Sequence, residues 1–154
     1  DIWSKYETES EGVYIACASI HGNTLKVCEK LKEILEEKGA EKVVLADLSR
    51  EDWAEALEDS FRYGKIVFAS ATYDMGIFTP MRDLLLNLKE KNYQNKKVAI
   101  IENGTWAPNA GKCMKEIIAT MKNVEIVEPV VTIKSTLKED NIEKLNELAE
   151  NLLK

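Results

Sequence analysis

The sequence predicts a doubly wound α/β domain, in which helices cover both faces of a parallel sheet. Short apolar segments of the kind found in fully buried strands recur along the chain, and a segment with helical spacing of its apolar residues follows each of them. Five strands alternating with five helices favour the strand order 2-1-3-4-5 with right-handed crossovers. The 154 residues are the length of one domain, which can bury a core without disulfides.

The first strand, helix and second strand follow one another closely. Residues 13–19 (VYIACAS) are a continuous apolar run, as expected for a strand buried on both faces. Residues 24–38 predict a helix that ends before Gly39. Residues 42–48 (KVVLADL) predict the second strand. The inner face of the helix is predicted to contain Leu25, Cys28, Leu31 and Leu35.

The second helix and the third strand come next. Ser49 and Asp52 form an S-x-x-D start signal for a helix that runs to about Phe61. Residues 65–70 (KIVFAS) are again apolar and predict the third strand. A loop is predicted over residues 71–78.

The third helix is predicted to begin at Thr79-Pro80, because proline is favoured at the first helical position. Residues 97–102 (KVAIIE) predict the fourth strand, and residues 103–109 a loop. The inner face of the helix is expected to contain Met81, Leu84, Leu85 and Leu88.

The last three elements complete the alternation. Residues 110–121 predict the fourth helix, and residues 124–133 contain the fifth strand. Thr136 and Glu139 form a T-x-x-E capping box for the fifth helix. Its inner face is expected to contain Ile142, Leu145, Leu148 and Leu152.

Charge and cysteine content exclude several classes of function. The net charge of −6 argues against nucleic-acid binding, and it suits a redox partner that carries a basic patch. No apolar run approaches the roughly 20 residues that span a bilayer, and no signal peptide is recognised. Cys17, Cys28 and Cys113 form no CxxC pair, so we expect small buried side chains in a reducing, cytoplasmic setting.

The first twelve residues differ from the rest of the chain. Residues 1–12 are acidic, carry Trp3 and Tyr6, and are interpreted as a linker or interdomain junction before a domain over residues 13–154. The chain begins with Asp1 instead of Met, which suggests a processed protein or a domain of a longer one.

A ligand site is expected where the strand order reverses, at the carboxyl ends of the first and third strands. The loop after the first strand carries hydrogen-bonding side chains and a glycine directly before a helix: Ser19, His21, Gly22, Asn23 and Thr24. Neutral donors at a helix N-terminus can hold a monophosphate dianion without Lys or Arg. Simple helix capping is the alternative, but it needs only one such residue.

Two further loops converge on the same crevice. The loop after the third strand contains Tyr73, which could stack on a planar ring, and Gly76, which permits an unusual backbone. The loop after the fourth strand contains Trp106, which could cover an aromatic ligand. Alternatively, both aromatic residues only close the core. Together the three loops favour a flat heterocycle on a monophosphate tail.

These loops resemble those of a known family. The motif Ser19-x-x-Gly22-Asn23-Thr24 after an apolar strand resembles the phosphate loop of flavodoxins, although His21 stands where the usual pattern has Thr. The motif Ser70-x-Thr72-Tyr73-x-x-Gly76 and the loop with Trp106 are similar to the C-terminal flavodoxin domain of flavodiiron proteins. The resemblance covers about residues 13 to 154 and implies a flavodoxin-like fold.

The resemblance also implies FMN as the cofactor. Its phosphate would be held by Ser19, His21, Gly22, Asn23 and Thr24. One side of the isoalloxazine would be lined by Thr72, Tyr73, Asp74 and Gly76, and the other by Asn103, Gly104, Thr105 and Trp106. The FMN would relay electrons from a rubredoxin-like or NAD(P)H-dependent reductase donor to a di-iron domain that reduces oxygen or nitric oxide. One histidine cannot build that metal site, so it would lie elsewhere in a parent chain.

Other functions are kept as alternatives. A free-standing flavodoxin would have the same cofactor and site, and an FMN-dependent quinone or azo reductase would oxidise NAD(P)H directly. A domain of this fold without its cofactor is a further alternative, because of His21. A receiver domain is disfavoured because Ser19 and Ser70 stand where it needs acidic residues, and a dinucleotide-binding domain because no G-x-G-x-x-G follows the first strand.

Overall fold

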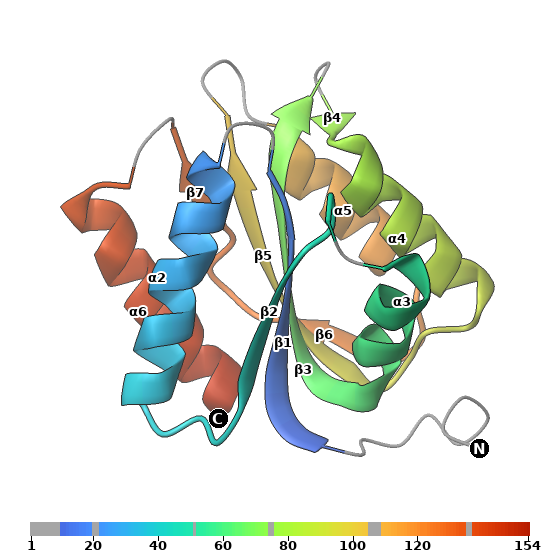
Figure 1. Ribbon diagram of the computed structural model, residues 1–154, viewed down its shortest axis with the longest axis horizontal. Helices are drawn as coiled ribbons and strands as arrows, with labels where there is room; N and C mark the ends of the chain where they lie inside the picture. Colours follow the sequence, from blue (N-terminus) through green and yellow to red (C-terminus); the bar gives the residue numbers. More distant parts are fainter. Residues whose placement is uncertain (1–9, 20–21, 51, 74–75, 105–108, 135–136) are drawn as a thin grey trace.

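The computed structural model describes residues 10–19, 22–50, 52–73, 76–104, 109–134 and 137–154. They form one twisted sheet between two layers of helices (Figure 1). The described strands are β1 (Ser10–Ala18), β2 (Val43–Asp47), β3 (Tyr63–Tyr73), β4 (Gly76–Ile77), β5 (Lys96–Asn103), β6 (Val124–Ile126) and β7 (Val131–Ile133). The described helices are α2 (Asn23–Glu37), α3 (Trp53–Arg62), α4 (Thr79–Glu90), α5 (Ala110–Ile118) and α6 (Glu139–Leu153).

The strand order confirms the predicted doubly wound topology. The parallel strands run in the order β2-β1-β3-β5-β6. This is the predicted order 2-1-3-4-5, because β5 is the fourth predicted strand and β6 belongs to the fifth. Ile15 pairs with Leu45 on one side and with Val67 on the other, so β1 lies between β2 and β3, and it is in register with both strands from Val13 to Cys17. The carboxyl ends of β1, β3 and β5 therefore meet at one edge of the sheet, called the carboxyl edge below; the opposite edge is the amino edge.

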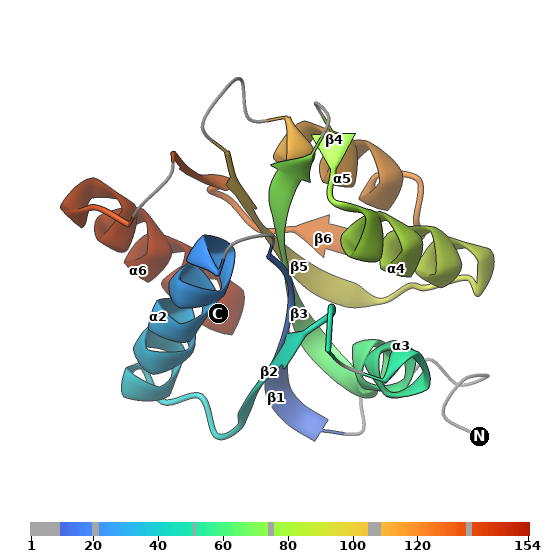
Figure 2. The same cartoon turned by 45° about the horizontal axis from the view of Figure 1, so that its top comes forward.

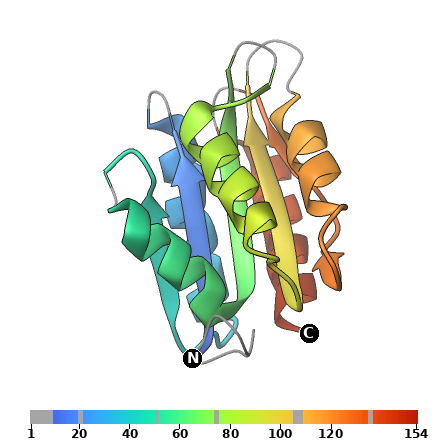
Figure 3. The ribbon, with the colours of Figure 1, turned by 90° about the vertical axis from the view of Figure 1, so that its right-hand side faces the viewer.

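Alternating residues of the strands pack into two separate hydrophobic cores, one on each face of the sheet. In β1, Val13, Ile15 and Cys17 face one layer, which consists of α2 and α6. Tyr14, Ala16 and Ala18 face the other layer, which consists of α3, α4 and α5. Figure 2 and Figure 3 show these layers on either side of the sheet. Because both faces are covered, the strands are apolar at nearly every position, as the sequence indicated.

The boundaries of the first, third and fifth strands differ from those predicted. The segment predicted as a loop after the third strand instead extends β3 to Tyr73 and returns as β4, which pairs antiparallel with β3. The predicted fifth strand is split into β6 and β7, both of which pair with β5. Pro129 lies between them, and proline has no N–H to continue a ladder. β1 begins at Ser10, three residues before the predicted strand.

Two predicted helix starts are wrong. The helix predicted to start at Ser49 begins at Trp53, because the Ser49 N–H and hydroxyl both bond the Asp47 carboxylate, at 3.1 and 2.7 Å. At the start of α6, the Asn141 side chain accepts from the Lys138 N–H at 3.0 Å, so Glu139 is the first helical residue instead of the third position of a capping box. Thr136 lies outside the described residues.

The helix faces largely follow the predicted periodicity. Leu25 and Ile142 are half-buried instead of buried, while Val27 and Ile34 join the buried face of α2. The fourth predicted helix ends earlier than expected, at Ile118. Within the described residues, every helix is too short or too polar to cross a bilayer.

Candidate functional site

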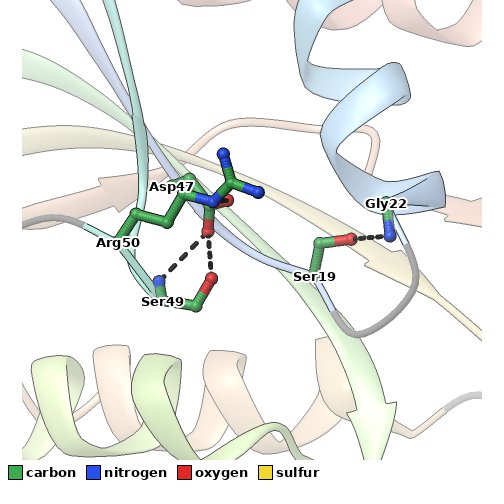
Figure 4. Close-up of polar contacts among 5 residues, drawn as sticks. All are labelled: Ser19, Gly22, Asp47, Ser49 and Arg50. Carbon is green, nitrogen blue, oxygen red and sulfur yellow. Dashed lines mark hydrogen bonds and ion pairs between the residues drawn. The ribbon is translucent and has the colours of Figure 1, made fainter.

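The predicted phosphate loop leads from β1 into the N-terminus of α2, shown in Figure 4. Ser19 is half-buried, and its Oγ accepts a hydrogen bond from the Gly22 N–H at 2.9 Å. Gly22 is the residue before the helix, with a φ of 83°. That left-handed conformation favours glycine, and it turns the chain into α2. Ser19 thus holds the glycine turn that starts the helix.

The donors at this helix start suit an anion. Asn23 and Thr24 are the first two residues of α2, and its first turn contains no acidic residue. The first backbone N–H groups of a helix have no partner within the helix, and the helix dipole favours negative charge there. A Cβ built on Gly22 would meet nothing within 4 Å, so the space beside the turn is open. The geometry therefore fits a phosphate held by neutral donors.

Two cysteines lie directly beneath this loop. Cys17 at the end of β1 and Cys28 on α2 are both fully buried. A hydrogen bond with Cys17, together with burial, raises the pKa of the Cys28 thiol, so it stays protonated and unreactive. Both are small buried side chains, as predicted, whereas Cys113 on α5 is half-buried.

The first and third predicted loops meet through a buried side-chain pair. Thr24 is 1% exposed and Asn103, the last residue of β5, is 7% exposed. The Asn103 side-chain amide donates to Thr24 Oγ1 at 3.4 Å. Gly104 follows, and its N–H donates to the Ile133 carbonyl at 3.0 Å. The structure therefore brings these residues of the first and third loops to one place.

The second predicted loop is represented by the β3–β4 hairpin. Thr72 is half-buried, and its Oγ1 accepts from the N–H groups of Asn109 at 3.3 Å and Ala110 at 3.4 Å. Thr72 thus caps α5. Tyr73 ends β3 and pairs with Gly76, the first residue of β4. Predicted site residues that lie outside the described part of the chain are His21, Asp74, Thr105 and Trp106.

Two residues of this edge contribute more than sequence reasoning assigned to them. Ser70 is fully buried, and its Oγ accepts from the Phe78 N–H at 3.3 Å, which holds the hairpin. Glu102 is a buried carboxylate that bonds the Gly111 N–H and the Thr132 hydroxyl. The signal for Glu102 was an acidic residue that ends the apolar run KVAIIE. The described part of the chain holds no group of three or more His, Cys, Asp or Glu residues suited to a metal ion.

The family model for flavodoxin matches residues 15–147, which include the glycine turn and the ends of β3 and β5. The chain belongs to the flavodoxin family. Membership of the flavodoxin family implies FMN as the cofactor, and the donor set at the start of α2 fits the FMN phosphate. No curated protein sequence matches the chain.

Solved structures of two kinds are similar to this chain. The rubredoxin oxygen:oxidoreductase of Desulfovibrio gigas superposes with a TM-score of 0.89 at 19% identity, over 98% of this chain and 37% of that one. A flavo di-iron protein mutant from Thermotoga maritima gives 0.79 at 24% identity, again over 98% and 37%. A flavodoxin from the domain Archaea gives 0.78 at 20% identity, over 92% and 96%. This chain thus spans little more than a third of the first two proteins.

Proposed function

We propose that this flavodoxin-family chain is the FMN-binding electron-transfer domain of a flavodiiron oxygen or nitric oxide reductase. The observation that carries the proposal is the extent of the structural match. The Desulfovibrio gigas oxidoreductase covers 98% of the chain, with a TM-score of 0.89, whereas the archaeal flavodoxin covers 92% with a TM-score of 0.78. The chain corresponds to 37% of that oxidoreductase, as expected for one domain of it.

The residues of the carboxyl edge have distinct tasks in this proposal. Ser19, Gly22, Asn23 and Thr24 bind the FMN phosphate through hydroxyl, amide and backbone donors. Asn103 holds Thr24 in place and forms one wall of the site. FMN supplies the redox chemistry when bound, and the protein binds and orients it.

The remaining predicted site residues complete the proposed site. Thr72, Tyr73, Asp74 and Gly76 line one side of the isoalloxazine ring, and Gly104, Thr105 and Trp106 line the other, as the family resemblance implies. His21 is proposed as a further donor to the phosphate or to the ribityl chain.

The partners follow from the same proposal. Electrons enter from a rubredoxin-like protein or an NAD(P)H-dependent reductase, and the net charge of −6 suits a donor with a basic docking patch. They leave to a di-iron domain in a longer chain, since this chain contains a single histidine.

A free-standing flavodoxin is the second candidate. A specific observation favours it: the match with this chain extends over 96% of the archaeal flavodoxin and 97% of flavodoxin 2 of Bacillus cereus. This function keeps the cofactor and the site, and it replaces the di-iron domain by a separate acceptor protein.

Titration of the apoprotein with FMN, FAD and riboflavin, followed by quenching of flavin fluorescence, tests the proposal. We expect one-to-one quenching by FMN and weaker binding of riboflavin, which lacks the phosphate. Thr24→Val is expected to weaken FMN binding about tenfold, because a donor near the phosphate is lost. Riboflavin binding should change little. Thr120→Val is the matched control, because the Thr120 hydroxyl is exposed and bonds the Ile117 carbonyl.

Each outcome of the titration has a defined meaning. No quenching by micromolar FMN would overturn the electron-transfer function. Equal losses for FMN and riboflavin in Thr24→Val would show that Thr24 acts through the fold instead of the phosphate. Rapid oxidation of NADH by the FMN-loaded protein alone would favour a quinone or azo reductase over a relay domain.

A further inference from the structure

Glu102 is a buried carboxylate at the carboxyl end of β5. It is 8% exposed, and it is the last residue but one of β5, directly after the apolar and fully buried residues Val98–Ile101. Its Oε1 accepts from the Gly111 N–H at 2.8 Å, and its Oε2 accepts from the Thr132 hydroxyl at 2.6 Å. One side chain thus ties together β5, the start of α5 and β7.

The charge of Glu102 is balanced without a cation. Among the residues that the structure describes, no Lys, Arg or His forms an ion pair with it. Gly111 is the second residue of α5, so the carboxylate lies at a helix N-terminus, where the dipole favours an anion. A Cβ on Gly111 would lie 2.9 Å from Glu102 Cδ, so a larger residue there would displace the carboxylate from its present position.

The segment between β5 and α5 is held at both ends by described contacts. At its start, the Gly104 N–H bonds the Ile133 carbonyl at 3.0 Å. At its end, the Asn109 N–H bonds Thr72 Oγ1 at 3.3 Å, and Glu102 accepts from the Gly111 N–H in the first turn of α5. The helix start is therefore capped by side chains from two strands, Thr72 from β3 and Glu102 from β5.

We propose that Glu102 is a positioning residue of the FMN site. It fixes the start of α5 and β7 against the end of β5, and so positions Asn103 and Gly104 at the end of β5 relative to Asn109. It also places a carboxylate at the carboxyl edge, where the FMN site is proposed. Because FMN gains negative charge on reduction, this carboxylate disfavours the reduced cofactor. The inference rests on the proposed FMN-binding function.

The test uses Glu102→Gln, which keeps the shape and removes the charge. Dissociation constants for oxidised FMN and for dithionite-reduced FMN are measured without oxygen. We expect the ratio of the reduced to the oxidised constant to fall about fivefold in Glu102→Gln. The matched control is Glu116→Gln on the exposed face of α5, which changes the net charge equally and should leave this ratio within about twofold of the starting protein.

A second variant tests the positioning effect of Glu102 apart from the effect of its charge. Thr132→Val removes one hydrogen bond to Glu102 and keeps the carboxylate. We expect both dissociation constants to rise together, by about threefold or more, with their ratio unchanged. This variant also serves if Glu102→Gln fails to fold.

The outcomes distinguish this inference from the proposed function. Failure of the unmodified protein to bind FMN would overturn both. If the unmodified protein binds FMN but Glu102→Gln gives the same ratio as Glu116→Gln, or Thr132→Val leaves both constants unchanged, Glu102 is not a positioning residue and the proposed function stands.

Discussion

The two edges of the sheet differ in the polar groups that they hold. The carboxyl edge presents hydroxyls and amides that bond one another across loops, such as Asn103 with Thr24 and Thr72 with the start of α5. The amino edge has a groove of about 830 Å³ whose lining includes Lys38, Lys65, Lys96 and Lys97.

Three of these four lysines have partners within the protein. Lys96 donates to the carbonyls of Phe61 and Tyr63 at 2.6 and 2.7 Å, Lys38 pairs with Glu150, and Lys97 bonds the Lys154 carbonyl. These three lysines are therefore engaged in interactions within the protein. The open helix N-terminus at the carboxyl edge is better suited to the cofactor that the family implies. The amino edge is expected to govern stability and the carboxyl edge binding.

Removal of a large side chain near the amino edge should have the largest effect. Phe61 is 2% exposed and packs edge-on against Tyr93, with ring centroids 5.1 Å apart. Phe61→Ala is expected to lower the free energy of unfolding by about 3–5 kcal/mol, measured by urea denaturation. FMN affinity of the folded protein should be unchanged. A large loss of affinity would contradict the division between the two edges.

The two ends of α2 offer a matched pair of substitutions. Gly22 and Gly39 both have positive φ, at 83° and 100°, and a Cβ on either meets nothing within 4 Å. Valine at either position should cost about 1–3 kcal/mol of stability through backbone strain. Only Gly22→Val should also weaken FMN binding, by about tenfold or more, in the same fluorescence titration. Equal FMN affinities in the two variants would refute the phosphate assignment at Gly22.

A smaller effect is expected in the pH dependence of stability. Burial lowers the pKa of Lys96 from 10.5 to about 8. Between these values the unfolded chain holds a proton that the folded chain has lost, so stability rises with pH. The cost of burying the ammonium is complete below pH 8 and disappears towards pH 10.5. Between pH 8 and pH 10, the free energy of unfolding of the unmodified protein should rise by about 1 kcal/mol more than that of Lys96→Met. If the free energies of unfolding of the two proteins changed equally with pH, the lowered pKa of Lys96 would be contradicted.

The sequence predicted what depends on local periodicity. Residues buried on both faces of β1 and the helix faces of α2 and α4 follow from apolar spacing, and strand order follows from the number and alternation of elements. The start of α3 could not be predicted from spacing in this way. The bonds from Ser49 to Asp47 compete with a helical cap, and spacing alone does not show which partner a hydroxyl takes.

The missed features of the site depend on distant contacts. Asn103 and Thr24 are 79 residues apart, and they meet because β5 and α2 both reach the carboxyl edge. The apolar residues before Glu102 predict that it lies in a strand. Its bonds to Gly111 and Thr132 could not be predicted, because they depend on where α5 and β7 pack in the fold. The β3–β4 hairpin likewise needs Ser70 beneath it, at 3.3 Å from the Phe78 N–H.

The division of the fifth strand also affects how the molecule meets other chains. Unpaired N–H and C=O groups along a sheet edge form a template for a strand of another molecule. Here β6 and β7 contribute three residues each, on either side of the segment that contains Pro129. Each stretch is too short to recruit a strand of ordinary length. The break at residues 127–130 therefore protects that side of the sheet from edge-to-edge aggregation.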